Sequence, residues 1–280
     1  MARRPLTLPE VAGQLGVHYM TAYRYVRTGR LPAKRVAGTW QVDPADLDKM
    51  RKSARGTGER RPTGVIPARL HLETRLIASD EPGAWEIIEA ALGSGMEPEA
   101  VLLEIISPTL RSIGELWEQG KLSVADEHRA SAVATRLISR LGARFGRRGH
   151  KRGTVIVAAP AGEMHSVPIA IAANLLRWHG FGVVELGADT PADALAEAAV
   201  GESDLVAVAI GCTSKNSPLA ARRAIAAVRQ KLPQVPILLG GAAVTTAAQA
   251  RRLGADMFTG SRADEIVHAL EAIVAAKPRA

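Results

Sequence analysis

The sequence predicts a multidomain protein: a winged helix-turn-helix at the N-terminus, a four-helix bundle in the middle and an α/β domain with a five-stranded parallel sheet at the C-terminus. Positive charge is concentrated in the first quarter of the chain. The middle has apolar residues at helical spacing, whereas strand-like and helix-like runs alternate from about residue 150 onward. The 280 residues are enough for two or three small domains.

Composition narrows the class of protein. Apolar residues make up 47% of the chain and charged residues 23%, which is ordinary for a soluble globular protein. No apolar segment is long enough to span a bilayer, and the N-terminal MARRPLTLPE lacks the apolar core of a signal peptide. The single cysteine, Cys212, excludes an internal disulfide and a multi-cysteine zinc site. We therefore expect a cytoplasmic protein with no membrane partner.

The charge is unevenly distributed. Residues 1–66 hold 13 basic and 5 acidic residues, while the remainder holds 23 of each. All of the excess positive charge therefore lies in the N-terminal part, which indicates a module that meets a polyanion such as DNA. A solubilising charged arm is the alternative interpretation.

Residues 1–52 have the pattern of a winged helix-turn-helix. A first helix is expected to open near Thr7, with Glu10 three residues later, and a second to run over 18–28 after Gly16. Two short strands around Ala37-Gly38 would form a basic wing before a third helix. The order resembles the excisionase and MerR-type family, which implies DNA binding; a helical protein-interaction domain is the alternative. The expected DNA contacts are Thr21, Tyr23, Arg24, Arg27, Lys34 and Arg35.

Residues 53–66 are rich in Gly, Arg, Ser and Pro and are predicted to be a linker, and 67–148 a four-helix bundle. Pro108 is expected to kink a long helix over 98–118, and Ser123 to cap the last helix. Trp117 ends one helix, and Glu127 and His128 lie in the first turn of the next, so the three could line one end of the bundle. A packed tryptophan beside two solvated residues is the alternative.

The remaining part, 149–280, predicts a doubly wound α/β domain. Strands are expected at 154–159, 182–186, 204–210, 236–239 and 256–259, and helices at 167–179, 191–200, 216–231, 244–252 and 263–276. Ligands of such sheets bind at the carboxyl ends of the strands, where three loops attract notice: 162–168, 211–214 and 240–243. The adjacent Gly240 and Gly241 would let a ligand approach the backbone closely.

The loop after the first strand carries Glu163 and His165, two residues apart. It holds a single glycine, Gly162, so it is not a glycine-rich phosphate loop, and it offers a possible metal ligand. A carboxylate beside an imidazole can accept the second ring N–H, which fixes the tautomer. An exposed loop histidine without a function is the alternative.

The motif "E-M-H-S-V-P", followed by "GCTS" and "LLGG", resembles the cobalamin-binding Rossmann-like (flavodoxin-like) domain. The preceding bundle, in which nine residues separate Trp117 from Glu127-His128, resembles the cobalamin-binding cap of B12-dependent regulators. With the MerR-type module, the order is similar to that of CarH/LitR-like photoreceptor repressors. The resemblance implies a non-enzymatic regulator that binds cobalamin, most specifically adenosylcobalamin, and DNA, and that acts as a homo-oligomer of two or four chains.

The resemblance also implies roles for individual residues. His165 would be the ligand of cobalt on the lower face, oriented by Glu163, and Trp117 would cover the upper face with Glu127 and His128 beside it. Gly240 and Gly241 would lie along the nucleotide tail. Three more residues complete the expected cofactor site: Ser166, Thr213 and Ser214.

Three positions depart from the family pattern. Pro168 stands where the family has glycine, and Gly211-Cys212-Thr213 matches the family's S-x-L poorly. Light-sensing members carry a histidine directly after the tryptophan, where this chain has Glu118. Two further hypotheses therefore stay open: a regulator that senses cobalamin or another small ligand without light, and a corrinoid enzyme or methyl-carrier subunit.

Overall fold

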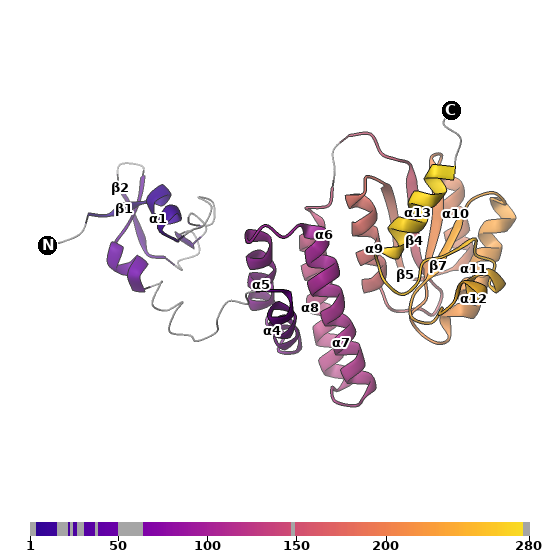
Figure 1. The fold of residues 1–280 in the computed structure, drawn as a ribbon, viewed down its shortest axis with the longest axis horizontal. Coiled ribbons are helices and arrows are strands. Elements are labelled where there is room, and N and C mark those ends of the chain that lie inside the picture. Colours follow the sequence, from indigo (N-terminus) through magenta and orange to yellow (C-terminus); the bar gives the residue numbers. More distant parts are fainter. Residues whose placement is uncertain are drawn as a thin grey trace. The chain divides into compact units, whose positions relative to one another are not determined.

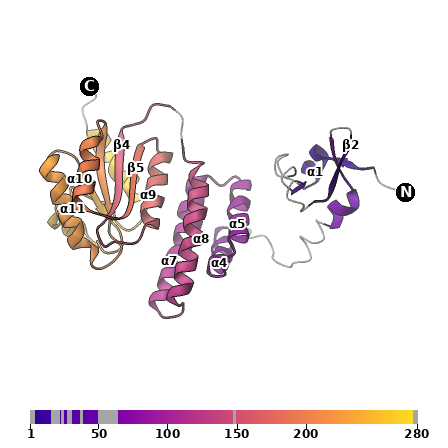
Figure 2. The ribbon, with the colours of Figure 1, turned by 180° about the vertical axis from the view of Figure 1, so that it is seen from behind.

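A computed structural model of the chain describes residues 4–15, 22, 25–26, 31–36, 39–49, 64–146 and 149–276. The chain divides into two compact units, Met1–Arg61 and Pro62–Ala280. The ribbon of both units is shown in Figure 1 and, from behind, in Figure 2.

The N-terminal unit contains a small antiparallel sheet. Its elements are β1 (Leu6–Thr7), α1 (Leu8–Leu15), β2 (Ala33–Val36) and β3 (Thr39–Val42), and the sheet order is β1-β3-β2. β2 and β3 pair in register, with Lys34 opposite Gln41 and Arg35 opposite Trp40, which confirms the predicted wing hairpin. Residues 44–49 are helical, as expected for the third helix.

The second helix of this unit is described at residues 22, 25 and 26, which are helical. Ala22 and Val26 belong to a core with Leu8, Val11, Leu31 and Leu47. The expected DNA contacts Thr21, Tyr23, Arg24 and Arg27 lie outside the described residues. Lys34 and Arg35 lie on β2 with exposed side chains.

The start of α1 follows its sequence signal. Glu10 Oε2 accepts hydrogen bonds from the Thr7 N–H at 2.9 Å and from the Thr7 hydroxyl at 3.0 Å. Arg4 forms a salt bridge with the same carboxylate. These hydrogen bonds, that from Arg4 first, lower the pKa of Glu10 to about 2. The glutamate therefore reaches back to the residue before the helix, as in one half of a capping box.

The helical part of the second unit has four main helices, α4 (Val65–Ile77), α5 (Glu81–Gly93), α7 (Ser107–Glu118) and α8 (Val124–Gly142), with α6 (Pro98–Ala100) and the π-helical η1 (Val101–Ile106) directly before α7. α8 begins with a complete capping box in which Ser123 accepts from the Asp126 N–H and the Asp126 carboxylate accepts from the Ser123 N–H. The predicted cap at Ser123 is therefore confirmed.

The segment 98–118 differs from the prediction of one α-helix kinked at Pro108. Residues 101–106 are π-helical, and α7 begins at Ser107 with Pro108 in its first turn. Proline has no N–H to complete the α-helical ladder, so the turn before it needs other partners. The Ser107 hydroxyl donates to the Leu102 carbonyl at 2.8 Å, and Arg69 of α4 donates to the Glu104 carbonyl. A wider, π-helical turn thus accommodates the N–H that Pro108 lacks.

The C-terminal part forms the predicted five-stranded parallel sheet, in the order β5-β4-β6-β7-β8. The strands are β4 (Thr154–Pro160), β5 (Gly182–Thr190), β6 (Leu205–Gly211), β7 (Ile237–Gly240) and β8 (Met257–Phe258). The helices are α9 (Val167–Trp178), α10 (Ala192–Gly201), α11 (Ser217–Lys231), α12 (Ala247–Arg252) and α13 (Glu265–Ala276). Apolar residues of α9 and α13 pack on one face of the sheet and those of α10, α11 and α12 on the other (Figures 1 and 2).

The helical part and the α/β part share one apolar core. Helix α8 packs against α9, and a Cβ at Gly142 of α8 would lie 3.1 Å from the Asn174 amide oxygen of α9. His179 Nε2, at the end of α9, contacts the Glu99 carboxylate at 2.7 Å. The C-terminal ends of α8 and α9 therefore meet. Within the described ranges, no helix has both the length and the apolar character that crossing a bilayer requires.

Candidate functional site

The strand order places the candidate site at the point where the connections diverge. β4 is flanked by β5 and β6, so the chain leaves β4 toward one neighbour and later returns on its other side. Open α/β sheets bind ligands at such a point, beside the carboxyl ends of the two strands, which here are β4 and β6. The loops at this edge are 161–166, after β4, and 212–216, after β6.

The loop after β4 begins with a tight turn. The Glu163 N–H donates to the Pro160 carbonyl at 2.9 Å, and Gly162, the third residue of the turn, has φ of +80°. This is the arrangement of a type II turn, in which glycine is favoured at that position. The turn reverses the chain at the end of β4, and Glu163 is the residue that closes it.

Glu163 is fully buried, with 0% of its surface exposed, and its carboxylate is saturated with donors. Oε2 accepts from the backbone N–H groups of Thr213 and Ser214, both at 2.7 Å, and from the Ser214 hydroxyl at 3.1 Å. Oε1 accepts from the His165 N–H at 3.1 Å and contacts the His165 ring at Nδ1. The carboxylate thus joins the loop after β4 to the loop after β6.

These hydrogen bonds determine the ionisation of Glu163. Burial alone would raise its pKa, but the bonds from Ser214, His165 and Thr213 outweigh burial and lower the pKa to about 2. The group is therefore a carboxylate at neutral pH. As an acceptor only, it requires a proton on the Nδ1 of His165, which leaves Nε2 as the nitrogen with a lone pair in the neutral ring.

His165 leaves its second ring nitrogen, Nε2, available to a ligand. Its side chain is 52% exposed, and among the described residues Nε2 has no hydrogen-bond partner. A half-exposed imidazole that is fixed at one nitrogen and open at the other is the usual form of a histidine that binds a metal. Ser166, the residue before α9, is also exposed, and its side chain makes no capping hydrogen bond.

The two departures from the family pattern in these loops have a local explanation. Pro168 lies in the first turn of α9, where a missing N–H costs nothing, so the helix starts normally after His165. Thr213 and Ser214 hold Glu163 mainly through backbone N–H groups. Every residue except proline supplies such a group, so this contact does not depend on the S-x-L side chains.

The packing of the loops requires glycine at positions 240 and 241, because a side chain there would overlap neighbouring atoms. Gly241 has φ of +103°, and a Cβ there would lie 2.2 Å from the Cys212 carbonyl oxygen. At Gly240 a Cβ would lie 2.2 Å from the Thr259 hydroxyl. The Cys212 N–H also donates to the Gly240 carbonyl at 2.8 Å. These glycines therefore bring the loops after β6, β7 and β8 into close contact at the edge that holds Glu163.

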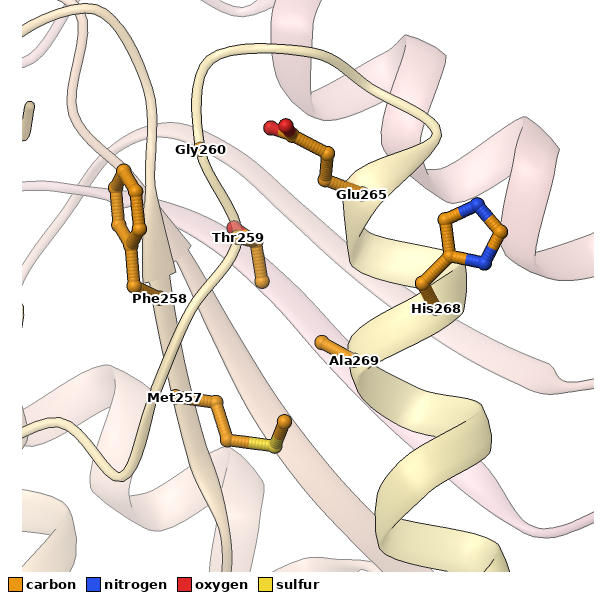
Figure 3. Close-up of a pocket in the computed structure, with 7 residues that line it drawn as sticks. All are labelled: Met257, Phe258, Thr259, Gly260, Glu265, His268 and Ala269. Atoms are coloured by element: carbon orange, nitrogen blue, oxygen red, sulfur yellow. The ribbon is translucent and has the colours of Figure 1, made fainter. Parts of the chain in front are cut away.

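A cavity of about 360 Å³ lies between the end of β8 and the start of α13 (Figure 3). Glu265 and His268 project from the first turns of α13, and the Glu265 carboxylate accepts from the Arg262 N–H at 3.2 Å. None of the predicted site residues lines this cavity. The lining residues are Met257, Phe258, Thr259, Gly260, Glu265, His268 and Ala269.

The helical part carries the other half of the predicted site. Trp117, in the last turn of α7, is 43% exposed although its ring is large and apolar. Glu127 contacts His128 Nδ1 at 2.9 Å and accepts from the Ser131 hydroxyl at 2.5 Å, so the carboxylate orients the His128 ring. The His128 side chain is 73% exposed, and Glu118 is exposed beside Trp117.

The structure thus brings together Glu163, His165, Thr213 and Ser214. Among the described residues, no hydrogen bond or ion pair joins this group to Trp117, Glu127 or His128. Asp189, at the end of β5, is not among the residues predicted from the sequence, and its carboxylate accepts from the Gly162 N–H at 2.7 Å. Its signal was an aspartate two residues after Gly187 at a strand end, which is typical of a turn.

Comparison with known proteins identifies three matched regions in the chain. Residues 71–141 and 153–270 each match a family model described as a B12 binding domain, and residues 5–55 match a helix-turn-helix domain. These matches define a B12-binding protein with a helix-turn-helix domain.

The chain is similar in sequence to proteins of two kinds, a transcriptional repressor and a corrinoid protein. The chain is 32% identical over 188 residues to the HTH-type transcriptional repressor CarH of Myxococcus xanthus, a match that covers 65% of this chain and 60% of CarH. It is 28% identical over 202 residues to trimethylamine corrinoid protein 1 of Methanosarcina acetivorans, covering 70% of this chain and 91% of that protein. The chain thus spans about 60% of the length of CarH, and it is similar both to this repressor and to a corrinoid protein.

The fold has also been seen in a solved structure. The monomethylamine corrinoid protein of Methanosarcina barkeri superimposes with a TM-score of 0.63 at 19% identity, covering 72% of this chain and 96% of that one. At this identity the likeness concerns the fold alone. It shows that a helical part followed by this five-stranded α/β part is a recurring architecture.

Proposed function

We propose that the chain is a transcription regulator that binds adenosylcobalamin through His165 and DNA through its N-terminal unit, and that light controls its binding to DNA. The observation that carries the proposal is the buried Glu163 carboxylate, which fixes His165 at Nδ1 and leaves Nε2 open at the ligand-binding edge of the sheet. The CarH relative supports the regulatory part, and the two B12 binding domains support the choice of cofactor.

The residues present fit a cobalt corrin. An oriented neutral imidazole is a suitable ligand for cobalt, and its carboxylate partner strengthens the nitrogen as a donor. Bound adenosylcobalamin would supply a cobalt–carbon bond that light breaks. Trp117 offers a flat apolar surface for the upper face of the corrin, and its 43% exposure is otherwise costly for an indole. Glu127 and His128 would lie beside it.

Control of DNA binding requires two states of the helical part relative to the α/β part, with the ligand favouring one of them. We propose that the bound ligand holds the Trp117 end of the helical part over the sheet edge and that its photolysis releases it. The chain then acts as a cytoplasmic homo-oligomer of two or four copies, because helix-turn-helix proteins commonly read two half-sites. As a transcription regulator, the chain is proposed not to be an enzyme.

Light and DNA binding can be tested together. DNA selected by the full chain from a random pool, in the dark and with adenosylcobalamin, is expected to lose affinity after illumination. Glu118→Ala is expected to respond like the parent, because an exposed carboxylate does not replace a neutral imidazole. Unchanged DNA binding after illumination, with photolysis seen in the visible spectrum, would leave a light-independent cobalamin sensor as the correct function.

Removal of residues 1–66 is expected to abolish specific DNA binding while cobalamin binding is retained, because the excess positive charge lies in that segment. In the full chain, the logarithm of the affinity is expected to fall with the logarithm of salt, by about 0.9 per phosphate neutralised. Lys34→Ala and Arg35→Ala should each reduce this slope by about 1. Specific binding by the shortened chain would contradict the assignment.

Trp117→Ala is expected to weaken adenosylcobalamin binding about tenfold and hydroxocobalamin binding much less, since the indole would cover only the larger upper ligand. Isothermal titration in the dark measures both affinities. Leu219→Ala is the matched control, because Leu219 is 70% exposed on α11 and lies outside the predicted site. Equal losses for the two ligands would place Trp117 away from the upper face.

A further inference from the structure

We propose that Asp189 is a positioning residue that holds the His165 loop in the form that binds cobalt. For its effect on the ligand, the inference rests on the proposed function, while the structural part concerns the protein without ligand. Asp189 was not among the residues expected at the site, and it lies on β5, the edge strand next to β4.

Two hydrogen bonds connect Asp189 to the loop. The Gly162 N–H donates to Asp189 Oδ1 at 2.7 Å, and the Asp189 N–H donates to the Glu163 carbonyl at 2.9 Å. One residue therefore accepts from the loop with its side chain and donates to it with its main chain. The two contacted peptide groups lie in the tight turn two and three residues before His165.

The backbone of Asp189 is adapted to this contact. Its φ is +51°, in the left-handed region, where aspartate and asparagine are tolerated better than alanine. The pairing of β4 with β5 is regular up to Val157, opposite Glu185, and shifts register after it, so that Pro160 lies opposite Thr190. The extra residues let the end of β5 turn toward the loop.

Asp189 and the loop after β6 hold the His165 loop from opposite sides. Thr213 and Ser214 fix the side chain of Glu163, whereas Asp189 fixes the main chain of Gly162 and Glu163. These two sets of contacts together fix the position of the backbone from which the His165 ring extends. A ligand histidine gains from such fixation because a displacement of about 1 Å weakens a metal bond. Asp189 is exposed, so we expect it to affect the loop more than overall stability.

The experiment compares three variants of the full chain. Asp189→Asn keeps the left-handed backbone and the acceptor oxygen, Asp189→Gly keeps only the backbone, and Asp189→Ala loses both. Without ligand, hydrogen exchange of the Gly162 amide is expected to rise about tenfold in Asp189→Ala and Asp189→Gly, but not in Asp189→Asn. With hydroxocobalamin, the affinity of Asp189→Ala is expected to fall about tenfold, and that of Asp189→Asn to stay within twofold.

Asp193→Ala is the matched control. Asp193 is also an exposed aspartate near the end of β5, but among the described residues it accepts only from the neighbouring Ala194 N–H at 3.0 Å. In Asp193→Ala, both the exchange rate of the Gly162 amide and the affinity for hydroxocobalamin should match those of the parent. Unchanged Gly162 exchange in Asp189→Ala overturns the inference, as does faster exchange with unchanged affinity. If the parent binds no hydroxocobalamin, the proposed function fails, and the exchange rates alone still decide whether Asp189 holds the loop.

Discussion

Replacement of His165 by alanine is expected to lower the affinity for hydroxocobalamin by on the order of 100-fold, with little change in the free energy of unfolding. The loss follows from removing the ring nitrogen Nε2 that is proposed to bind cobalt, since changes to the groups around a metal ligand already cost roughly 10–100-fold. Stability should change by less than about 1 kcal/mol, because the ring is 52% exposed and Glu163 keeps its other donors.

The visible spectrum supplies a second measurement for this variant. With His165 on cobalt, the nucleotide base of cobalamin is displaced, whereas any cobalamin bound to His165→Ala should keep its own base. His150→Ala is the control, because His150 is an exposed histidine in the loop before β4. If His165→Ala binds with the affinity and spectrum of the parent, His165 is not the ligand, and the arrangement around Glu163 has only a structural role.

The architecture of the α/β part was predictable because each of its elements has a strong local signal. β4 is an unbroken apolar run that ends at a glycine-containing turn, and it is buried along its whole length. Helix α8 has both capping residues, Ser123 and Asp126, three positions apart. Signals of this kind depend on neighbours in sequence, so they survive without knowledge of the tertiary structure.

Features that depend on distant partners were not predictable in the same way. The π-helical segment before Pro108 is accompanied by a bond from Arg69, which lies 35 residues before Glu104 in the chain. The sequence predicts that Gly241 lets a ligand approach the backbone, but it does not show that the atoms that exclude a side chain there belong to Cys212. In both cases the neighbour in space decides the conformation, and the sequence shows only that an unusual residue is present.

The candidate site also has features that depend on neighbours in sequence and features that depend on distant partners. The pairing of Glu163 with His165 is local and was anticipated from their spacing. The complete burial of Glu163 was not, because two of its donors are backbone N–H groups 50 and 51 residues away. Backbone donors leave no mark in a sequence. Asp189 was missed for a related reason, since its role depends on a left-handed backbone at the end of an edge strand.

Replacement of Glu163 by glutamine is expected to reduce both stability and cobalamin binding, in contrast to His165→Ala. One amide NH₂ must take the place of a carboxylate oxygen, so it faces either the Thr213 and Ser214 N–H groups or the N–H and ring of His165. Buried donors left without an acceptor cost about 1–3 kcal/mol, so we expect the free energy of unfolding to fall by roughly 2–4 kcal/mol. Cobalamin affinity should fall about 10–100-fold, because the His165 tautomer is no longer fixed.

The pH dependence of unfolding gives an independent check on Glu163. Its pKa in the folded chain is lowered to about 2 from an ordinary value of 4.5, so ionisation stabilises the folded state above pH 4.5. That contribution, on the order of 3 kcal/mol, is lost as the pH falls from about 4.5 to about 2. Glu163→Gln should therefore be less stable than the parent at pH 7, and the difference should shrink in acid.

Glu185→Gln separates this effect from the loss of an ordinary surface charge. Glu185 forms an ion pair with Arg177 at 3.0 Å and is 30% exposed, so its replacement should cost no more than about 1 kcal/mol. Denaturant unfolding at pH 7 and at pH 3 measures both variants. If Glu163→Gln were as stable as Glu185→Gln at pH 7, the buried carboxylate would not hold the two loops together. The fixed orientation of His165, on which cobalt binding is argued to depend, would then need another source.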